Sequence, residues 1–201
     1  MNVFNETTIF GNNIKSICQD DYGDIWVGTE LGLSKLDTRT RKFERITNTK
    51  YNLKDIEKIF NDKNGNIWFR NSDGIYKYEQ ALNEVECISC GDNLEINSFS
   101  NIYSTHSNEI LISTFSNLYR YDFDNDTLKS MLNSNNSTIE ISFVTDIIEI
   151  DNTLWIGSKN GLIKLPYDPK LKPQVYKAKT SSLVNDDIRD IEFSKKKNEI
   201  W

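Results

Sequence analysis

The 201-residue sequence contains only two alanines, Ala81 and Ala178, against 24 isoleucines and 24 asparagines. Alanine is the strongest helix former, whereas isoleucine favours strands and asparagine favours turns. The shortage of alanine therefore argues against a mainly helical architecture. A hydrophobic fraction of 37%, with 11% aromatic residues, is too high for a disordered chain. The sequence predicts a folded protein built of strands and turns.

Long apolar runs and an excess of basic residues are also missing. No stretch of membrane-spanning length is apolar, and the N-terminus lacks the basic start and apolar core of a secretory signal. With 24 basic and 30 acidic residues, the net charge is −6. Binding to phosphate backbones needs a basic face. We therefore expect no nucleic-acid partner and no membrane contact by this segment.

Residues that carry acid–base or metal chemistry are scarce. The single histidine, His106, lies in a predicted hairpin turn, where a solvated role is the simplest interpretation. Cys87 and Cys90 form one C-x-x-C, but a zinc site needs two further ligands at suitable spacing, and neither Cys18 nor His106 has it. We interpret the cysteines as ordinary strand residues, and predict no catalytic site, no metal and no cofactor.

A run of aspartates superficially resembles the start of a calcium loop. Asp122, Asp124 and Asp126 alternate in D-F-D-N-D-T, but the sixth position is Thr127 where the loop needs glycine, and the twelfth is Asn133 rather than glutamate. The segment also aligns with a plain turn in the first repeat. We interpret it as a turn between two strands.

The main signal is an internal repeat. Five segments align on an anchor residue, and the anchors are 42, 43, 44 and 46 residues apart. A second motif follows each of the first four anchors: G-L-S-K-L-D (32–37), G-I-Y-K-Y-E (74–79), N-L-Y-R-Y-D (117–122) and G-L-I-K-L-P (161–166). A period in this range indicates a repeat architecture. The aligned segments are D-Y-G-D-I-W-V-G-T (21–29), K-N-G-N-I-W-F-R-N (63–71), H-S-N-E-I-L-I-S-T (106–114), D-N-T-L-W-I-G-S (151–158) and K-K-N-E-I-W (196–201).

Within each repeat the apolar residues alternate with polar ones, which is typical of strands. Four short antiparallel strands every 43 residues or so predict the blade of a β-propeller. The large anchor side chains, such as Trp26, are expected to fill the space between neighbouring blades. In the first repeat the four strands are predicted at residues 14–19, 25–29, 33–37 and 42–46.

Glycines mark the turns of the repeat. Gly23 and Gly65 lie in the first hairpin turn, where positive φ is expected. Glycine also marks the next connection, except that Asn117 replaces it in the third repeat, and asparagine is the next most tolerant residue for the left-handed conformation. The glycines of that second connection are Gly32, Gly74 and Gly161.

We predict one all-β propeller segment with four full blades and partial blades at both ends. The chain then reads as part of a longer protein, although a closed five-bladed ring that shares one incomplete blade is an alternative. The predicted divisions are residues 1–11 (last strand of a preceding blade), 12–52, 53–97, 98–140 and 141–184 (blades 1 to 4) and 185–201 (start of blade 5).

The repeat consensus, D-x-x-G-x-I-W-[VF]-G-T followed by G-L-x-K-[LY]-D, resembles the two-component regulator propeller repeat. The resemblance extends from about residue 12 to residue 201 and is weakest at 98–132, where Leu111 replaces tryptophan and Ser113 replaces glycine. It implies the sensor region of bacterial hybrid histidine kinases or diguanylate cyclases. Such a region lies outside the cytoplasmic membrane, binds a small molecule or glycan, and continues into further blades and an output domain.

Two other functions remain open at this stage. Streptogramin lyase-like propeller enzymes carry a similar G-x-I-W-F-T segment, and WD-repeat propellers act as protein-interaction scaffolds. For a sensor, the ligand is expected at the end of the blades that holds the B–C turns and the D–A connections, where A to D are the four strands of a blade in order. The candidate ligand-binding residues there are Asn13, Glu30, Arg70, Asn71, Asp73, Lys159 and Asn160.

Overall fold

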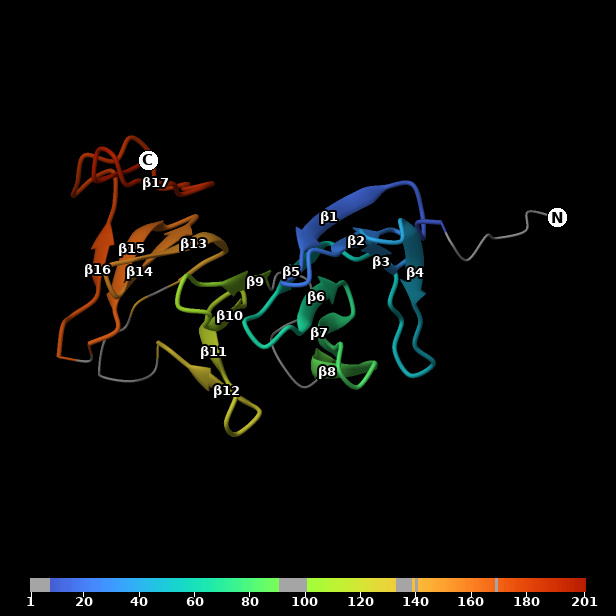
Figure 1. The fold of residues 1–201 in the computed structure, drawn as a ribbon. Helices are drawn as coiled ribbons and strands as arrows, with labels where there is room; N and C mark the ends of the chain where they lie inside the picture. The colour runs from blue at the N-terminus through green and yellow to red at the C-terminus, as the bar shows by residue number, and fades with distance from the viewer. Residues whose placement is uncertain (1–7, 91–100, 133–138, 140, 169) are drawn as a thin grey trace. The chain divides into compact units, whose positions relative to one another are not determined.

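The structure, a computed structural model, describes residues 8–90, 101–132, 139, 141–168 and 170–201. The chain divides into two compact units, residues 1–98 (unit 1) and 99–201 (unit 2), and each is considered by itself. All regular elements of the described residues are β-strands (Figure 1). The described part of the chain holds no helix with the length and apolar character that crossing a bilayer requires.

Unit 1 contains two four-stranded antiparallel sheets, blade 1 with the order β1-β2-β3-β4 and blade 2 with the order β5-β6-β7-β8. The four strands of blade 1 have the bounds expected from the sequence, so that prediction is confirmed. The strands are β1 (Ile14–Gln19), β2 (Ile25–Thr29), β3 (Leu33–Asp37), β4 (Lys42–Ile46), β5 (Lys58–Asn61), β6 (Ile67–Asn71), β7 (Gly74–Glu79) and β8 (Glu84–Cys90).

Unit 2 contains two further four-stranded antiparallel sheets and a two-stranded one. Blade 3 consists of β9 to β12, blade 4 of β13 to β16, and the fifth repeat is represented by β17 and β18. The strands are β9 (Asn101–Ser104), β10 (Ile110–Ser113), β11 (Leu118–Asp122), β12 (Thr127–Ser130), β13 (Val144–Ile150), β14 (Thr153–Ser158), β15 (Gly161–Pro166), β16 (Gln174–Tyr176), β17 (Phe193–Ser194) and β18 (Glu199–Ile200).

The predicted strand of a preceding blade falls mainly on residues 1–7, which lie outside the described residues. Residues 8–10 form no strand, but they attach to blade 1. The backbone N–H of Phe10 donates to Ser34 Oγ at 3.0 Å, and Arg45 Nη2 donates to Thr8 Oγ1 at 3.0 Å. The division of the chain into blades beyond these strands stays a prediction.

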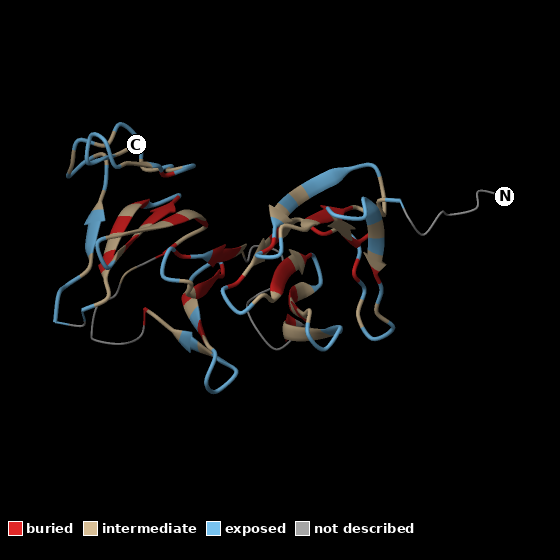
Figure 2. Cartoon of the chain, in the orientation of Figure 1, coloured by how far each residue is buried: buried red, intermediate tan, exposed pale blue. Residues whose placement is uncertain are grey.

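The core of unit 1 lies between its two blades. Trp26 and Trp68 are both fully buried, and the rings of Trp26 and Tyr78 of blade 2 are 5.4 Å apart. Figure 2 shows the buried residues of this unit concentrated in the inner strands of each sheet. The prediction that the anchor side chain fills the space between neighbouring blades is confirmed for Trp26.

Unit 2 has a separate core of aliphatic residues. Leu111, the anchor of the third repeat, is fully buried in a cluster with Ile147 and Leu165 of blade 4. Trp155 is only half-buried, and Trp201 is 65% exposed. Both residues depart from the expected core role, and for Trp155 the described part of the neighbouring fifth repeat is a two-stranded sheet, which offers less surface to pack against.

The hairpin turns follow the sequence signals in most places. Gly23 and Gly65 have φ angles of +86° and +80°, as predicted. Gly74 and Asn117 correct the prediction, because neither is among the described residues with positive φ. Asn117 shows how such a turn closes without it. Its turn is closed by side chains instead: Asn117 N–H donates to Thr114 Oγ1 at 3.1 Å, and Asn117 Oδ1 accepts from the Leu118 N–H at 2.8 Å.

Candidate functional site

The antiparallel strands give every blade two distinct ends. The turn from the second to the third strand and the connection between successive blades lie at one end, which we call the loop face. The two hairpin turns, from the first to the second strand and from the third to the fourth, lie at the opposite end, which we call the turn face. The seven residues predicted to bind a ligand all lie at the loop face, five in unit 1 and two in unit 2.

Two of the predicted residues meet where the chain enters blade 1. The carboxylate of Glu30 accepts the backbone N–H groups of Asn12 at 3.3 Å and Asn13 at 2.9 Å. Glu30 Oε2 also lies 2.9 Å from the position of a Cβ on Gly11, whose φ is +113°. Glu30 therefore holds the entering segment against the turn between β2 and β3, and Asn13 contributes its backbone to that contact.

Two basic residues of this face in unit 1 are paired with carboxylates. Arg70 Nη2 forms an ion pair and hydrogen bond with Glu57. Lys15 Nζ lies 2.6 Å from Asp55 Oδ1, and this hydrogen bond is the main reason that the pKa of Lys15 is raised above its ordinary value. Arg70 and Lys15 are thus neutralised by neighbours within the unit.

Asn71 and Asp73 order the connection that leads into blade 2. Asn71 is buried, and its Nδ2 donates to the carbonyl oxygens of Asn52 at 2.7 Å and Lys54 at 3.0 Å. Its Oδ1 accepts the N–H of Asp73 at 2.9 Å, while Asp73 Oδ2 accepts from Asn52 Nδ2 at 2.9 Å. The structure brings these two predicted residues together. Their contact with a ligand stays a prediction.

The loop face of unit 2 has a different character, because aromatic rings are exposed there. Phe115, in the turn between β10 and β11, is 47% exposed. Its ring meets that of Phe143, just before β13, edge to face at a centroid distance of 4.6 Å. Lys159 Nζ lies 4.5 Å from the centroid of the Phe143 ring. Two aromatic side chains and an exposed ammonium group therefore share one surface.

The backbone of Phe143 is unusual for its residue type. Its φ is +51°, and its N–H donates to the carbonyl oxygen of Phe115 at 3.3 Å. In unit 1 the equivalent residue is Asp55, with φ of +58° and an N–H that donates to the Glu30 carbonyl oxygen at 3.1 Å. Aspartate tolerates this left-handed conformation, whereas a bulky residue is a strained outlier in it. Unit 2 thus places an aromatic ring where the fold favours a small polar residue.

Lys159 and Asn160, the two residues predicted in unit 2, flank this aromatic pair. The N–H of Lys159 donates to the Ser142 carbonyl oxygen at 3.2 Å, next to Phe143. The N–H of Asn160 donates to Ser158 Oγ at 3.1 Å, and both side chains are exposed. The sequence did not point to Phe115 and Phe143, because a phenylalanine in a strand-rich chain is normally expected to be buried in the core. The available signal was the alignment of Phe143 with Asp55.

His106 and the aspartates of the calcium-like segment lie at the turn face. His106 is exposed in the turn before β10, as expected. Asp122 accepts from Asn125 Nδ2 at 2.8 Å and is paired with Lys129. The hydrogen bond from Lys129 is the main reason that the pKa of Asp122 lies far below its ordinary value. Among the described residues, no three His, Cys, Asp or Glu side chains are grouped as a metal site requires.

The cysteines differ from their predicted role as ordinary strand residues. Cys18 is free, but Cys87 is disulfide-bonded, so the prediction is wrong for Cys87. The pairing of β7 with β8 shifts its register beside this position and leaves Ile88 as an extra residue. Such a bulge interrupts the strict alternation of side chains that the prediction assumed. The side chain of Cys90 lies outside the described part of the chain.

Comparison with known proteins places these observations in a family context. The sequence model described as two component regulator propeller matches residues 8–30, which include β1 and β2. Among curated proteins, no relative matches the sequence.

Several solved structures share the fold. One is an extracellular domain described as that of a hybrid two-component system, BT4673 from B. thetaiotaomicron, with a TM-score of 0.72 and 20% identity over 96% of this chain and 26% of that one. PorZ, described as a surface component of the type-IX secretion system of Porphyromonas gingivalis, has a TM-score of 0.71 and 13% identity over 96% and 31%. Virginiamycin B lyase from Staphylococcus aureus has a TM-score of 0.67 and 12% identity over 94% and 62%.

At these identities the likeness concerns the fold, and this chain spans about a quarter of the length of the BT4673 domain. The four-stranded antiparallel blades and the similarity to propeller structures agree with the architecture predicted from the repeat. The protein is therefore an all-β propeller segment, and its residues 8–30 match the two component regulator propeller model.

Proposed function

We propose that this chain is a ligand-sensing, non-catalytic propeller segment from the extracytoplasmic sensor region of a bacterial signal-transduction receptor. The family match at residues 8–30 supports this proposal, as does the likeness to an extracellular domain described as part of a hybrid two-component system. Because the chain spans 26% of that domain, we propose that further blades and an output domain belong to the same receptor.

The loop face of unit 2 carries the proposal. A repeated scaffold holds the backbone constant, yet the position that is Asp55 in unit 1 is Phe143 in unit 2. Keeping a bulky residue at positive φ costs about 1–3 kcal/mol. A residue that opposes the local backbone preference and leaves aromatic surface exposed is typical of a binding site. Phe143, Phe115 and Lys159 are therefore the residues we assign to ligand contact.

The chemistry of this surface suits a small polar molecule or a glycan. The exposed ring of Phe115 offers a flat apolar face. Lys159 and Asn160 add hydrogen-bond donors, and the Asn160 amide adds an acceptor. A ligand that presents one flat apolar side and a hydroxyl or carboxylate group would use all of them.

The test is a glycan array followed by calorimetry on the best responders. We expect Phe143→Asn to weaken binding at least tenfold while leaving the fold intact, because asparagine tolerates positive φ. Phe123→Ala is the matched control, since it removes a 38% exposed phenylalanine from the turn face at the opposite end of blade 3. Equal effects of both substitutions, or binding that ignores Phe143→Asn, would remove the support for this site.

A lyase function is the second candidate, because the virginiamycin B lyase structure has a similar fold. A propeller enzyme needs catalytic side chains that converge on one site. The chain's only histidine, His106, is exposed at the turn face, away from the aromatic surface of unit 2. Turnover of a streptogramin B substrate that His106→Ala abolishes would establish the enzyme and displace the sensor.

A further inference from the structure

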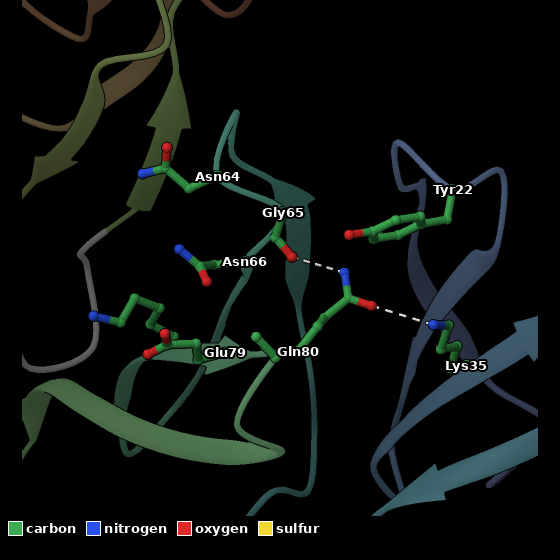
Figure 3. A pocket seen from close by; sticks show the side chains of 9 residues that line it. Tyr22, Lys35, Asn64, Gly65, Asn66, Glu79 and Gln80 are labelled. Atoms are coloured by element: carbon green, nitrogen blue, oxygen red, sulfur yellow. Dashed lines mark hydrogen bonds between the residues drawn. The ribbon is translucent and has the colours of Figure 1, made fainter.

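A pocket of about 490 Å³ opens at the turn face of unit 1, between blades 1 and 2. Figure 3 shows Tyr22 of blade 1 on one side of it, and Asn64, Asn66 and Glu79 of blade 2 on the other. This volume lies within the range of small-molecule sites. The pocket is at the opposite end of the blades from the residues discussed for the loop face, so it is a separate site.

Gln80 links the two blades at the pocket through hydrogen bonds. Its Nε2 donates to the Gly65 carbonyl oxygen at 2.7 Å, and its Oε1 accepts from Lys35 Nζ at 3.2 Å (Figure 3). The amide is thereby engaged at both of its ends, once within blade 2 and once across to blade 1. The side chains around it are positioned by the fold before any ligand arrives.

The charges that line the pocket do not balance. Lys35 Nζ is 3.0 Å from Asp24 Oδ2, and Lys77 Nζ is 2.7 Å from Glu86 Oε2, so both ammonium groups are compensated. Glu79 forms no ion pair or hydrogen bond through its carboxylate with any described residue. The pocket therefore presents one uncompensated negative charge.

The remaining polar groups of the pocket favour a hydrogen-bond donor as the ligand. Asn66 Nδ2 donates to Asp62 Oδ2 at 3.0 Å, which orients the amide and leaves Asn66 Oδ1 as an acceptor. Asn64 supplies a second amide oxygen. Tyr22 is 78% exposed, and its ring offers the negative face that attracts cations.

We propose that this pocket binds a small organic cation with a primary amine. The ammonium group is expected to form a charge-assisted hydrogen bond with Glu79 and a second bond with an Asn66 or Asn64 amide oxygen. Its alkyl part lies against the Tyr22 ring. The carboxylate and the amide oxygen accept two of the three donors of the ammonium group, and the aromatic face covers its apolar stem.

The probe is 1,4-diaminobutane, titrated calorimetrically into the 201-residue chain at low ionic strength. We expect saturable binding with one site per chain. Glu79→Gln should weaken binding at least about tenfold, the value of one charge-assisted hydrogen bond. Tyr22→Ala should weaken it by about threefold, because the alkyl part loses the exposed ring that it lies against. Glu79→Asp keeps the charge and should retain most of the affinity.

Glu84→Gln is the matched control. Glu84 lies opposite Glu79 in the register of β7 and β8. It is exposed, but it does not line the pocket. The two variants change the net charge equally, so equal weakening would reduce the effect to long-range attraction and overturn the proposal. Absence of saturable heat with the unsubstituted chain would also overturn it. So would glucose binding that survives Glu79→Gln, because the pocket would then recognise a neutral polyol.

Discussion

The indole Nε1 of Trp26 donates a 2.8 Å hydrogen bond to Oδ2 of Asp20, and both side chains are buried. The other oxygen of Asp20 accepts the backbone N–H groups of Tyr22 and Asp24, each at 3.0 Å, and so closes the first hairpin turn of blade 1. One carboxylate thus satisfies the turn and the indole of the residue that packs between the blades. A buried indole N–H without an acceptor would destabilise the fold.

The same hydrogen bond recurs in blade 2, whereas blade 3 has neither the aspartate nor the tryptophan. Trp68 Nε1 donates to Asp62 Oδ2 at 2.8 Å. In blade 3 the two positions are occupied by Thr105 and Leu111. Thr105 Oγ1 still accepts a turn N–H, that of Glu109, at 3.1 Å, so the turn contact is kept. Blade 3 therefore lacks both the indole and its carboxylate acceptor.

This pairing predicts strong coupling between the two positions of blade 1. Asp20→Thr should keep the turn but leave the Trp26 N–H without its acceptor, which lowers the free energy of unfolding by about 1–3 kcal/mol. In a Trp26→Leu background the same change should cost much less, because no indole remains. Urea unfolding of the two single variants and the double variant measures the coupling energy. Additive costs would show that Asp20 acts through the turn alone.

Much of the fold could be predicted because the same pattern of strand and turn residues occurs four times in the sequence. The alternation of side chains fixed the bounds of β1 to β4, and the glycines at positions 23 and 65 marked turns that need positive φ. Asn117 could not be predicted, because side-chain hydrogen bonds can close a turn without a left-handed residue. Cys87 could not be predicted either, since a bulge leaves no mark in the alternation before the partner strand is known.

The candidate sites were less accessible from the sequence. Polar residues at the loop face, such as Arg70 and Asn71, attract attention because loops bind ligands, yet a sequence does not show that Glu57 and Asn52 engage them within unit 1. The pocket at the turn face depends on two blades packing side by side. Residues in its hairpin turns, such as Tyr22, look like ordinary solvated positions until that packing is known.

Gly28 offers a second test of blade packing. A Cβ at this position would lie 2.6 Å from Ile56 Cγ2 and 3.1 Å from the Ile56 carbonyl oxygen, which belongs to the segment leading into blade 2. Gly28→Ala should therefore destabilise the protein by about 1–3 kcal/mol through overpacking. Thermal or urea unfolding measures the loss.

Gly65→Ala is the control for that experiment. Its φ is +80°, but no atom lies within 4 Å of an added Cβ, so only backbone strain of about 1 kcal/mol is expected. If Gly28→Ala proved no more damaging than Gly65→Ala, the close approach of Ile56 to Gly28 would not limit the packing of blade 2 on blade 1.

Cys18 should react slowly in the folded protein. Burial, with a smaller contribution from the nearby charge of Asp20, raises the pKa of its thiol to about 12. Because the thiolate is the nucleophile, alkylation of Cys18 by iodoacetamide at mildly alkaline pH should be at least about 100-fold slower than in urea. Peptide mass spectrometry follows the Cys18 site directly. Equal rates in the folded and unfolded chain would mean that the thiol is not held in a desolvated position.

The last prediction concerns the acidic pair Asp146 and Asp190 in unit 2. Burial, and then the neighbouring Asp190, raise the pKa of Asp146 above its ordinary value. A carboxyl group with a raised pKa binds its proton more tightly in the folded state. Its contribution to stability is therefore present at low pH and is lost as pH rises through the unfolded and then the folded pKa.

Asp190→Asn should accordingly raise the free energy of unfolding at neutral pH, by on the order of 0.5 kcal/mol for a partly exposed pair. The gain should vanish in acid, where both carboxyl groups are protonated. Asp187→Asn is the matched control, because Asp187 Oδ2 lies 3.8 Å from Arg189 Nε and its removal relieves no repulsion. Urea unfolding at neutral and acidic pH separates the two. A gain from Asp190→Asn that persists in acid would show that the side-chain change, and not repulsion with Asp146, is responsible.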